Sequence, residues 1–394
     1  MSERICIVGG GFGGLYTSLR LNELPLETTE KPEIVLIDKS DRFLFTPLLY
    51  ELITGEMQSW EIAPPFAEVL ADTEIRFVQG EVTDIDVENR RVKLGNNSEM
   101  SYDQLAIALG GTTPLNIVGG AAEYALPFRT LEDVYRLEEK LRKLEHSTVD
   151  KIRVAIVGGG YSGVELACAL ADRLGERGKI RLIERGEMIL ATSPEFNRET
   201  AKKALQLKRV WLDLETTVAS LEPDTISLLY KGQTDTIPVD LVLWTVGTKV
   251  NQLVSNLPLK QNKSGKLVTN PLLQVADYPN IFALGDVACC FDASGQEMPA
   301  TAQVAFQQSD YCAWNIWASL TERPMLPFRY ENLGEMLALG VDNATITGKG
   351  IKLDGIAAYT ARRLAYLYRL PSQKHQLSVS LNWITKPFFD LLQG

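Results

Sequence analysis

The chain has 394 residues, a formal net charge of −10 at pH 7 and a hydrophobic content of 45%. These values are typical of a packed globular protein with two or three domains. The acidic balance disfavours a general nucleic-acid binder, which needs a basic surface to displace counterions. We expect no N-terminal signal peptide, because an apolar strand-like segment begins at Ile5, and no apolar run is long enough to span a bilayer.

The N-terminal segment predicts a nucleotide-binding unit. An apolar run at residues 5–8 leads into residues 9–14 (GGGFGG), which fit the G-x-G-x-x-G fingerprint and precede a helix-like segment. Its glycines permit a tight turn, a close approach of a pyrophosphate and close helix–strand packing, and the helix N-terminus attracts the diphosphate. A second predicted strand, residues 34–37, ends in Asp38, whose carboxylate can accept hydrogen bonds from ribose hydroxyls. The alternative interpretation is a tight turn without a ligand, followed by a surface acid.

The same order of elements recurs in the middle of the chain. After a predicted amphipathic helix at residues 132–143, an apolar run leads into residues 158–163 (GGGYSG), and the strand at residues 180–183 ends in Glu184. An acid at this position repels a 2′-phosphate and favours NADH over NADPH, whereas the neighbouring Arg185 opposes that preference, so the choice stays open. Two fingerprints in this context indicate two nucleotide sites, with electrons passing between two cofactors.

This internal repeat predicts an α/β fold with two Rossmann-like dinucleotide-binding domains. In each unit a later apolar strand ends in a glycine, at Gly110 and at Gly247. A third apolar strand, residues 281–284, ends in Gly285 and Asp286, and that carboxylate can bind a polyol such as the ribityl chain of a flavin. Alternatively, Asp286 caps the next helix, which we expect over residues 300–320. The predicted domains are residues 1–115 and 251–327 for the first nucleotide, residues 116–250 inserted for the second, and a C-terminal element at residues 328–394.

The five cysteines point to packing and not to redox or metal chemistry. None of them belongs to a C-x-x-C pair, and the adjacent Cys289 and Cys290 would bridge only with strain. We interpret them as small buried hydrophobic residues, and we expect no metal site.

The C-terminal tail has a composition of its own. Residues 356–394 contain five cations and many aromatic side chains against the single acid Asp390, in an otherwise acidic protein. Residues 356–370 are predicted to form a helix with one apolar side and arginines beside it, and a second apolar segment at residues 379–392 is interrupted by Pro387. The pattern fits an in-plane anchor on an anionic membrane. A helix docked on the protein's own core, or a dimer interface, fits it equally well. The cations are Arg362, Arg363, Arg369, Lys374 and Lys386.

Four motifs carry a resemblance to a known family. They are residues 45–49 (FTPLL), 163–167 (GVELA), 284–286 (LGD) and 299–308 (PATAQVAFQQ). With them the chain resembles, over essentially its whole length, the flavoproteins with two dinucleotide-binding domains, and among these the type II NAD(P)H:quinone oxidoreductases.

A narrower resemblance is to the cyanobacterial and plastid branch of that family, which includes demethylphylloquinone reductase. The segments that carry it are residues 60–64 (WEIAP), 243–247 (LWTVG), 314–318 (WNIWA) and 332–336 (NLGEM). The chain departs from the respiratory members at Tyr161 and Ser162, where Pro-Thr is common, and this adds to the open question of NADH against NADPH.

The resemblance implies that FAD binds the first domain and NADH or NADPH the second. Glu165 would lie between nicotinamide and flavin, and Gln303 and Gln307 would line the quinone-facing side; these three are the candidate catalytic residues. The alternatives are a first-turn acid favoured by the helix dipole and an exposed polar stripe at i, i+4 spacing. The candidate cofactor-binding residues are Gly9, Gly11, Phe12, Gly13, Gly14, Asp38, Lys39, Thr46, Pro47, Val82, Gly110, Gly158, Gly160, Tyr161, Ser162, Gly163, Glu184, Gly247, Gly285, Asp286 and Ala302.

The implied activity is a two-electron reduction of a membrane quinone without proton pumping. The quinone would be a naphthoquinone or plastoquinone, and in this branch demethylphylloquinone for phylloquinone biosynthesis. The implied location is peripheral, on the cytoplasmic side of a thylakoid or plasma membrane, and homodimerisation stays open. The alternatives are a soluble ferredoxin- or rubredoxin-type reductase and a redox-regulated flavoprotein resembling apoptosis-inducing factor.

Overall fold

The computed structural model describes residues 3–25 and 31–393, with the side chains of residues 386–393 outside that description. The chain divides into two compact units, each built from three segments. The first unit comprises Met1–Leu44, Ala63–Thr112 and Thr248–Glu331, and the second comprises Phe45–Ile62, Thr113–Gly247 and Asn332–Gly394. Each unit contains a largely parallel sheet of Rossmann-like topology, which confirms the predicted α/β fold class.

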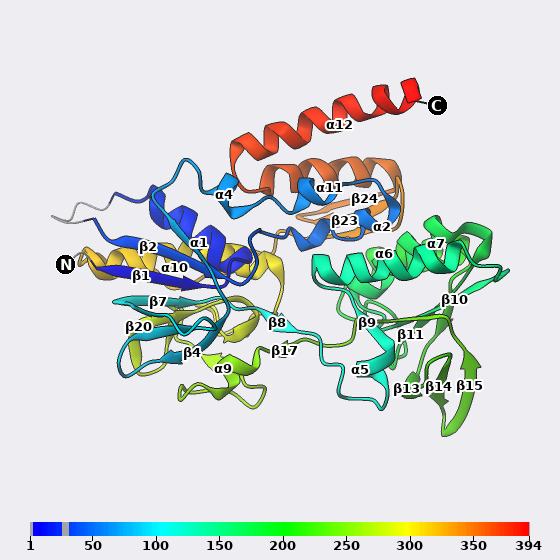
Figure 1. Cartoon of the computed structure of the whole chain (residues 1–394), viewed down its shortest axis with the longest axis horizontal. Coiled ribbons are helices and arrows are strands. Elements are labelled where there is room, and N and C mark those ends of the chain that lie inside the picture. The colour runs from blue at the N-terminus through cyan, green and yellow to red at the C-terminus, as the bar shows by residue number, and fades with distance from the viewer. Residues whose placement is uncertain (1–2, 26–30, 394) are drawn as a thin grey trace. The chain divides into compact units, whose positions relative to one another are not determined.

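The core of the first unit is a six-stranded sheet in the order β19-β20-β7-β1-β2-β3 (Figure 1). β1 (Arg4–Val8) lies between β2 (Glu33–Asp38) and β7 (Gln104–Ile107) and pairs in parallel with both. β1 is a nearly continuous apolar run, as expected for a parallel strand covered on both faces. The strand order reverses at β1, and ligands of such sheets bind where the carboxyl ends of the strands meet this reversal.

Helices cover this sheet, and two of them pack closely together. α1 (Phe12–Glu23) contacts α10 (Ala302–Leu320), with the rings of Tyr16 and Phe306 4.6 Å apart. α10 begins at Ala302 because the Thr301 hydroxyl accepts a hydrogen bond from the Val304 N–H at 3.2 Å. Other elements of this unit are β3 (Arg76–Gln79), β4 (Val82–Asp86), β5 (Arg91–Leu94), β6 (Glu99–Ser101), β8 (Gly111–Thr112), β17 (Lys249–Val250), β18 (Leu267–Val268), β19 (Gln274–Val275), β20 (Tyr278–Ala283), β21 (Ala288–Cys289), α4 (Phe66–Val69), α9 (Gln252–Asn256) and the 3₁₀ helix η3 (Gly285–Val287).

The second unit repeats the arrangement with a five-stranded parallel sheet in the order β12-β11-β10-β16-β9. β10 (Ile152–Val157) lies between β11 (Gly178–Ile183) and β16 (Leu241–Trp244). The helix predicted at residues 132–143 is present as α6 (Leu131–Glu145). A capping box formed by Thr130 and Asp133 stabilises its N-terminus. Other elements are β9 (Ala125–Pro127), β12 (Trp211–Asp213), β13 (Thr216–Leu221), β14 (Thr225–Tyr230), β15 (Gln233–Pro238), α5 (Ala121–Tyr124), α7 (Tyr161–Leu174), α8 (Glu195–Leu207) and the 3₁₀ helix η2 (Gly175–Arg177).

The second unit also contains the C-terminal residues, which form a small sheet and two helices. The strands β22 (Glu335–Ala338), β23 (Ala344–Gly348) and β24 (Ile351–Asp354) pair in antiparallel order. The helix predicted at residues 356–370 is present as α11 (Gly355–Arg369), but the predicted interruption at Pro387 is wrong, because α12 (Gln373–Gln393) runs through it. The short elements of residues 45–62 are the 3₁₀ helix η1 (Thr46–Leu48), α2 (Glu51–Thr54) and α3 (Ser59–Ile62).

Of the tail arginines, which the sequence pattern placed beside the apolar side of this helix, Arg362 lies on the buried side itself. This side chain is buried on the same face of α11 as Ala358, Tyr359 and Tyr366. The side chains of Lys386, Phe388, Phe389 and Asp390 lie outside the described residues. Among the described helices, none combines the length and hydropathy that crossing a bilayer requires.

Candidate functional site

The first fingerprint forms a tight turn between β1 and α1. Gly9 has a φ of +100°, and an added Cβ on Gly14 would collide with the Gly9 carbonyl, so the turn itself requires both glycines. At Gly11, by contrast, an added Cβ would meet nothing within 4 Å. Gly11 precedes α1 and makes no side-chain cap for it, so the space at Gly11 lies at the N-terminus of this helix.

Asp38 stands beside this turn, at the end of β2. Its carboxylate accepts the Gly10 N–H at 2.5 Å and the Ser40 N–H at 2.7 Å. These two bonds fix the carboxylate next to the glycine turn. The neighbouring Lys39 is exposed, and Val82 is the half-buried first residue of β4.

The predicted Gly-Asp pair packs onto the same turn. An added Cβ on Gly13 would lie 3.1 Å from the Leu284 side chain, and one on Gly111, next to Gly110, would lie 3.3 Å from an Asp286 carboxylate oxygen. Gly285 has a φ of +71°, and its N–H donates to the buried Gln308 side chain at 2.7 Å. The first unit thus brings together the glycine turn, Asp38, Gly110, Gly285 and Asp286.

The two candidate glutamines of α10 hold a neighbouring segment of chain. The Tyr330 hydroxyl donates to Gln303 at 2.6 Å. Gln307 donates its amide N–H to the Glu331 carbonyl at 2.8 Å and accepts the Glu331 N–H at 2.9 Å. Sequence reasoning did not assign Gln308, although it belongs to the same motif and is the more deeply buried of the adjacent pair.

The second fingerprint builds an equivalent turn in the second unit. Gly158 has a φ of +112°, and an added Cβ on Gly163 would collide with the Gly158 carbonyl, whereas one on Gly160 would meet nothing within 4 Å. Glu184, at the end of β11, accepts the N–H groups of Gly159 and Gly186, each at 2.7 Å. The two units therefore share one design, with glycines closing the turn and an acid fixed beside it.

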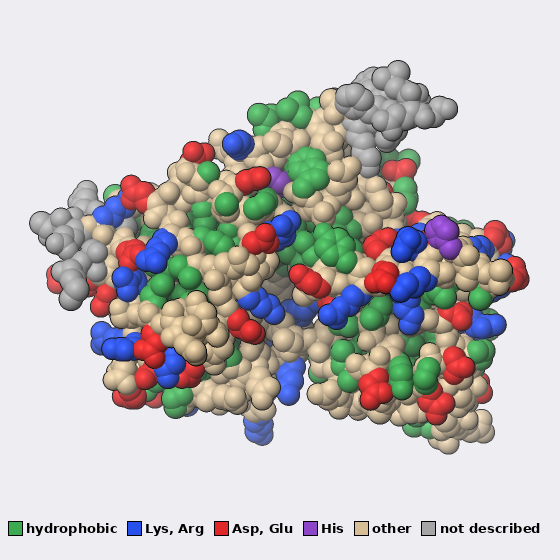
Figure 2. Space-filling model, in the orientation of Figure 1, with side chains coloured by type: hydrophobic (Ala, Val, Ile, Leu, Met, Phe, Trp, Pro, Cys, Tyr) green, Lys and Arg blue, Asp and Glu red, His purple; other side chains and the backbone are tan. Residues whose placement is uncertain are grey.

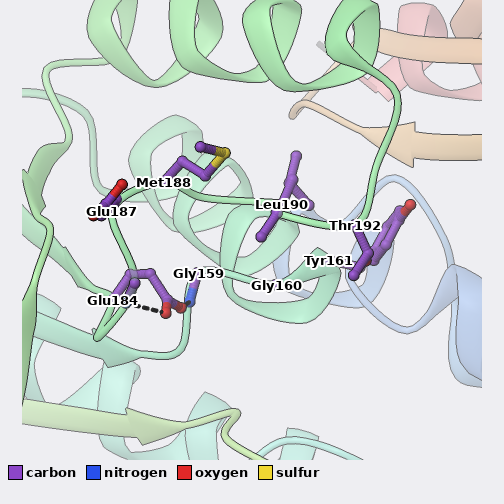
Figure 3. A pocket seen from close by; sticks show the side chains of 10 residues that line it. Gly159, Gly160, Tyr161, Glu184, Glu187, Met188, Leu190 and Thr192 are labelled. Atoms are coloured by element: carbon purple, nitrogen blue, oxygen red, sulfur yellow. Dashed lines mark hydrogen bonds between the residues drawn. The ribbon is translucent and has the colours of Figure 1, made fainter.

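A pocket of about 540 Å³ opens beside this turn (Figure 3). Glu184 lies at one end of it, and Tyr161 and Thr192 lie at the other. Next to Tyr161 in the sequence, Ser162 accepts a hydrogen bond from the Tyr50 hydroxyl at 2.9 Å. Gly247 has a φ of +76° and follows β16. The pocket is lined by Gly159, Gly160, Tyr161, Glu184, Gly186, Glu187, Met188, Leu190, Ala191 and Thr192.

Glu165 lies one turn after Tyr161 on α7 and is buried beside a second acid and an arginine. Its carboxylate accepts the Ala338 N–H at 2.9 Å and lies 3.6 Å from the Arg362 guanidinium, which is also paired with Glu51. Burial raises the pKa of Glu165 to about 8, although Arg362 and the Ala338 N–H oppose that rise. One cation therefore faces two carboxylates, and Glu165 holds its proton near neutral pH.

Sequence reasoning missed Glu51 and counted Arg362 only among the cations of the tail. Arg362 also donates to the carbonyl of Pro47 in η1 at 2.6 Å, so the segment of Thr46 and Pro47 is a 3₁₀ turn held by this arginine. The signal that could have identified Arg362 as buried is its spacing of four residues from Ala358 and from Tyr366 in the sequence. It shares the buried face of α11 with Ala358 and Tyr366 at i+4 intervals.

All five cysteines lie in the described part of the chain and are free and buried. Burial raises the pKa of Cys6, Cys168 and Cys312 to about 12 and that of Cys290 to about 11, so these thiols stay protonated. Among the side chains that the structure describes, no group of three from His, Cys, Asp or Glu is arranged to hold a metal ion.

Comparison with known proteins agrees with this geometry. The chain is 60% identical, over 99% of its length and 98% of the relative, to demethylphylloquinone reductase NdbB of Synechocystis sp.. It is 43% identical, over 98% of its length and 81% of the relative, to the alternative NAD(P)H-ubiquinone oxidoreductase C1, chloroplastic/mitochondrial, of Arabidopsis thaliana. Its fold matches that of NDH2 from Plasmodium falciparum in complex with NADH, with a TM-score of 0.86 and 19% identity over 99% of both chains.

A family model connects both units. Residues 3–309 match the model of the pyridine nucleotide-disulphide oxidoreductases, and this range includes both glycine turns, β20 and Asp286. This chain therefore belongs to the pyridine nucleotide-disulphide oxidoreductase family, and the relatives to which it is 60% and 43% identical are quinone reductases.

Proposed function

We propose that this protein is an FAD-dependent NAD(P)H:quinone oxidoreductase that does not pump protons and whose membrane substrate is demethylphylloquinone. The observation that carries the proposal is the 60% identity to demethylphylloquinone reductase over nearly the whole of both chains. Phylloquinone biosynthesis would then be the route that this activity serves.

The residues of the first unit fit FAD. The open space at Gly11 accommodates a diphosphate against the helix N-terminus, and Asp38 is fixed where a ribose would lie. Gly9, Gly13 and Gly14 would shape this cradle. Bound there, FAD would take a hydride from NADH or NADPH and pass two electrons to a quinone. The other residues of this unit proposed to hold it are Phe12, Lys39, Val82, Gly110, Gly285, Asp286 and Ala302.

The second unit would hold the pyridine nucleotide in the 540 Å³ pocket. Gly160 leaves the same open space that Gly11 leaves in the first unit, and Glu184 is fixed where it can accept hydrogen bonds from a ribose. Gly158, Gly163 and Gly247 would set the backbone around the nucleotide, beside Tyr161 and Ser162.

We propose distinct roles for the three candidate catalytic residues. Glu165 would hold a proton on its carboxyl group near neutral pH, because burial raises its pKa to about 8, and would deliver that proton during quinone reduction. Gln303 and Gln307 would act by shaping the quinone-facing wall, because their amides hold Tyr330 and Glu331 in place.

The membrane surface that we propose lies on α11 and α12. The exposed side chains of Leu377, Leu381 and Ile384 recur at i, i+4 and i+7, so they form one apolar stripe along α12. Figure 2 shows hydrophobic side chains gathered over the outer side of this helix. Ile356, Leu364 and Tyr368 add exposed apolar area on α11. A helix of this kind lies in the plane of a membrane, which fits a peripheral location on the cytoplasmic side.

The decisive experiment separates the two half-reactions. The FAD-loaded protein is mixed with NADH or NADPH in a stopped-flow instrument, and the loss of flavin absorbance is followed. The reduced protein is then mixed with demethylated naphthoquinone, with plastoquinone analogues or with oxidised ferredoxin. We expect rapid bleaching by a nicotinamide nucleotide and reoxidation that a naphthoquinone accelerates most. Reoxidation that no quinone accelerates would overturn the proposed function.

A further inference from the structure

We propose that Glu335, on the first strand of the C-terminal sheet, is a positioning residue for the pyridine nucleotide. It would act through Ser193, which in turn fixes the hydroxyl of Tyr161 at the wall of the nucleotide pocket. The inference rests on the proposed function only in that the pocket takes NADH or NADPH.

A chain of hydrogen bonds joins these residues. The Tyr161 hydroxyl donates to the Ser193 hydroxyl at 3.2 Å, and the Ser193 hydroxyl donates to a carboxylate oxygen of Glu335 at 2.6 Å. Because the carboxylate can only accept, it directs both hydroxyl protons toward itself. The Tyr161 oxygen, whose proton is used in this chain, keeps lone pairs that can accept from a ribose hydroxyl or a carboxamide N–H of a ligand.

Glu335 is itself held in place from behind. Asn197, which is fully buried in α8, donates to Glu335 at 3.4 Å and to Thr347 at 2.9 Å, and accepts from Thr345 at 2.9 Å. Both threonines belong to β23, next to β22 in the sheet. The carboxylate is therefore a fixed acceptor and not a mobile surface charge.

The place of Tyr161 in the pocket indicates which part of the nucleotide it would contact. It is the first residue of α7 and follows Gly160, where the backbone leaves room for a diphosphate. In Figure 3 it lies at the end of the pocket opposite Glu184. Because Glu184 stands where an adenosine ribose binds, Tyr161 flanks the half of the molecule that contains nicotinamide.

The same strand also holds Glu165. Glu335 and Ala338 are the two ends of β22, and the Ala338 N–H donates to Glu165 at 2.9 Å. Tyr161 and Glu165 are one helical turn apart on α7, so they share a face of that helix. β22 thus fixes the nucleotide-facing tyrosine at one end and the buried acid at the other, which makes the C-terminal sheet part of the nucleotide site.

A double-mutant cycle tests the proposal. Glu335→Ala and Tyr161→Phe should each weaken binding of NAD⁺ or NADP⁺ by about three- to tenfold, the effect of one lost hydrogen bond. The double variant should be no worse than either single variant, because both changes break one chain of bonds. Glu335→Gln should restore most of the affinity, since its amide oxygen still accepts from Ser193.

The measurements are calorimetric titration of the oxidised FAD-loaded protein and the nucleotide dependence of flavin bleaching. Asp342→Asn is the matched control, because Asp342 is an exposed acid in the turn between β22 and β23 and its change of charge should leave binding unaltered. Unchanged affinity in Glu335→Ala, or additive losses in the double variant, would refute the positioning role. Failure of the proposed function shows differently, as a wild-type flavin that no nicotinamide nucleotide bleaches.

Discussion

The buried cluster of Glu51, Glu165 and Arg362 makes stability depend on pH. The pKa of Glu165 is raised from its usual 4.5 to about 8 by burial. Because the folded state binds this proton more tightly than the unfolded chain, the stabilisation is complete below pH 4.5 and is lost as pH rises to 8. Each pH unit in that window removes up to about 1.4 kcal/mol.

The first prediction is that Glu165→Gln flattens this pH dependence. The neutral amide keeps an acceptor for the Ala338 N–H and has no proton to lose. The melting temperature of the wild type should therefore fall relative to that of the variant between about pH 5 and 9. Thermal unfolding of the FAD-loaded proteins across this range measures it. Parallel curves for the two proteins would show that Glu165 titrates normally.

The second prediction compares two glycines of the same turn. In Gly160→Ala the added methyl group has no atom of the protein within 4 Å, and alanine can adopt the backbone conformation of this position, so the protein should fold normally. The variant should bind the nucleotide at least about tenfold more weakly, because the methyl group occupies the space proposed for the diphosphate. In Gly163→Ala the methyl group collides with the Gly158 carbonyl, and the free energy of unfolding should fall by about 1–3 kcal/mol. Denaturant unfolding and nucleotide titration separate the two effects. Equal stability losses in both variants would contradict this division.

At the scale of elements, local patterns predicted the Rossmann strands well. Residues 5–8, 34–37 and 180–183 fall within β1, β2 and β11, because buried parallel strands are short apolar runs bounded by glycines or acids. The strands β22–β24 could not be predicted in this way. Their role depends on contacts such as Ser193–Glu335, which are 142 positions apart in the sequence.

The elements of the tail show the same limit. A proline usually ends a helix, which is why an interruption was expected at Pro387, but α12 continues through it. The sequence left open whether the tail arginines face a membrane or the protein's own core, because composition does not say which side of a helix is covered. Arg362 is buried against Glu51, and the Arg363 guanidinium lies 4.4 Å from the ring of Trp383. The domain boundaries and the roles of the site residues stay predictions.

The third prediction concerns the docking of α12. The buried carboxylate of Glu61, on α3, accepts the Trp383 indole N–H at 2.7 Å and the Asn382 amide at 3.2 Å. Glu61→Ala removes the acceptor of both hydrogen bonds. We expect the free energy of opening α12 from the rest of its unit to fall by about 1–3 kcal/mol. Hydrogen exchange of residues 373–385 measures this opening, and Lys374→Ala, at an exposed position of the same helix, is the control. Unchanged protection in Glu61→Ala would show that packing alone holds the helix.

For the whole molecule, the net charge opposes binding to an anionic membrane, whereas the exposed apolar side chains of the tail favour binding to a membrane. The net charge of −10 repels anionic lipids. The exposed part of the tail offers apolar side chains, whereas Arg362 contributes no surface charge. Attachment to a membrane should therefore depend on buried apolar area and little on lipid charge, unlike the electrostatic anchor that the composition of the tail indicated.

The fourth prediction is that the full-length protein floats with zwitterionic vesicles and stays bound at about 0.5 M salt, where surface charges are largely screened. Changing Leu377, Leu381 and Ile384 together to Ser should weaken this binding at least about tenfold, because the apolar stripe of α12 is lost. Leu207→Ser, at an exposed position of α8, is the matched control and should float like the wild type. If the stripe instead joins two copies of the chain, the wild type will stay in the buffer as a dimer, and the triple variant will sediment as a monomer.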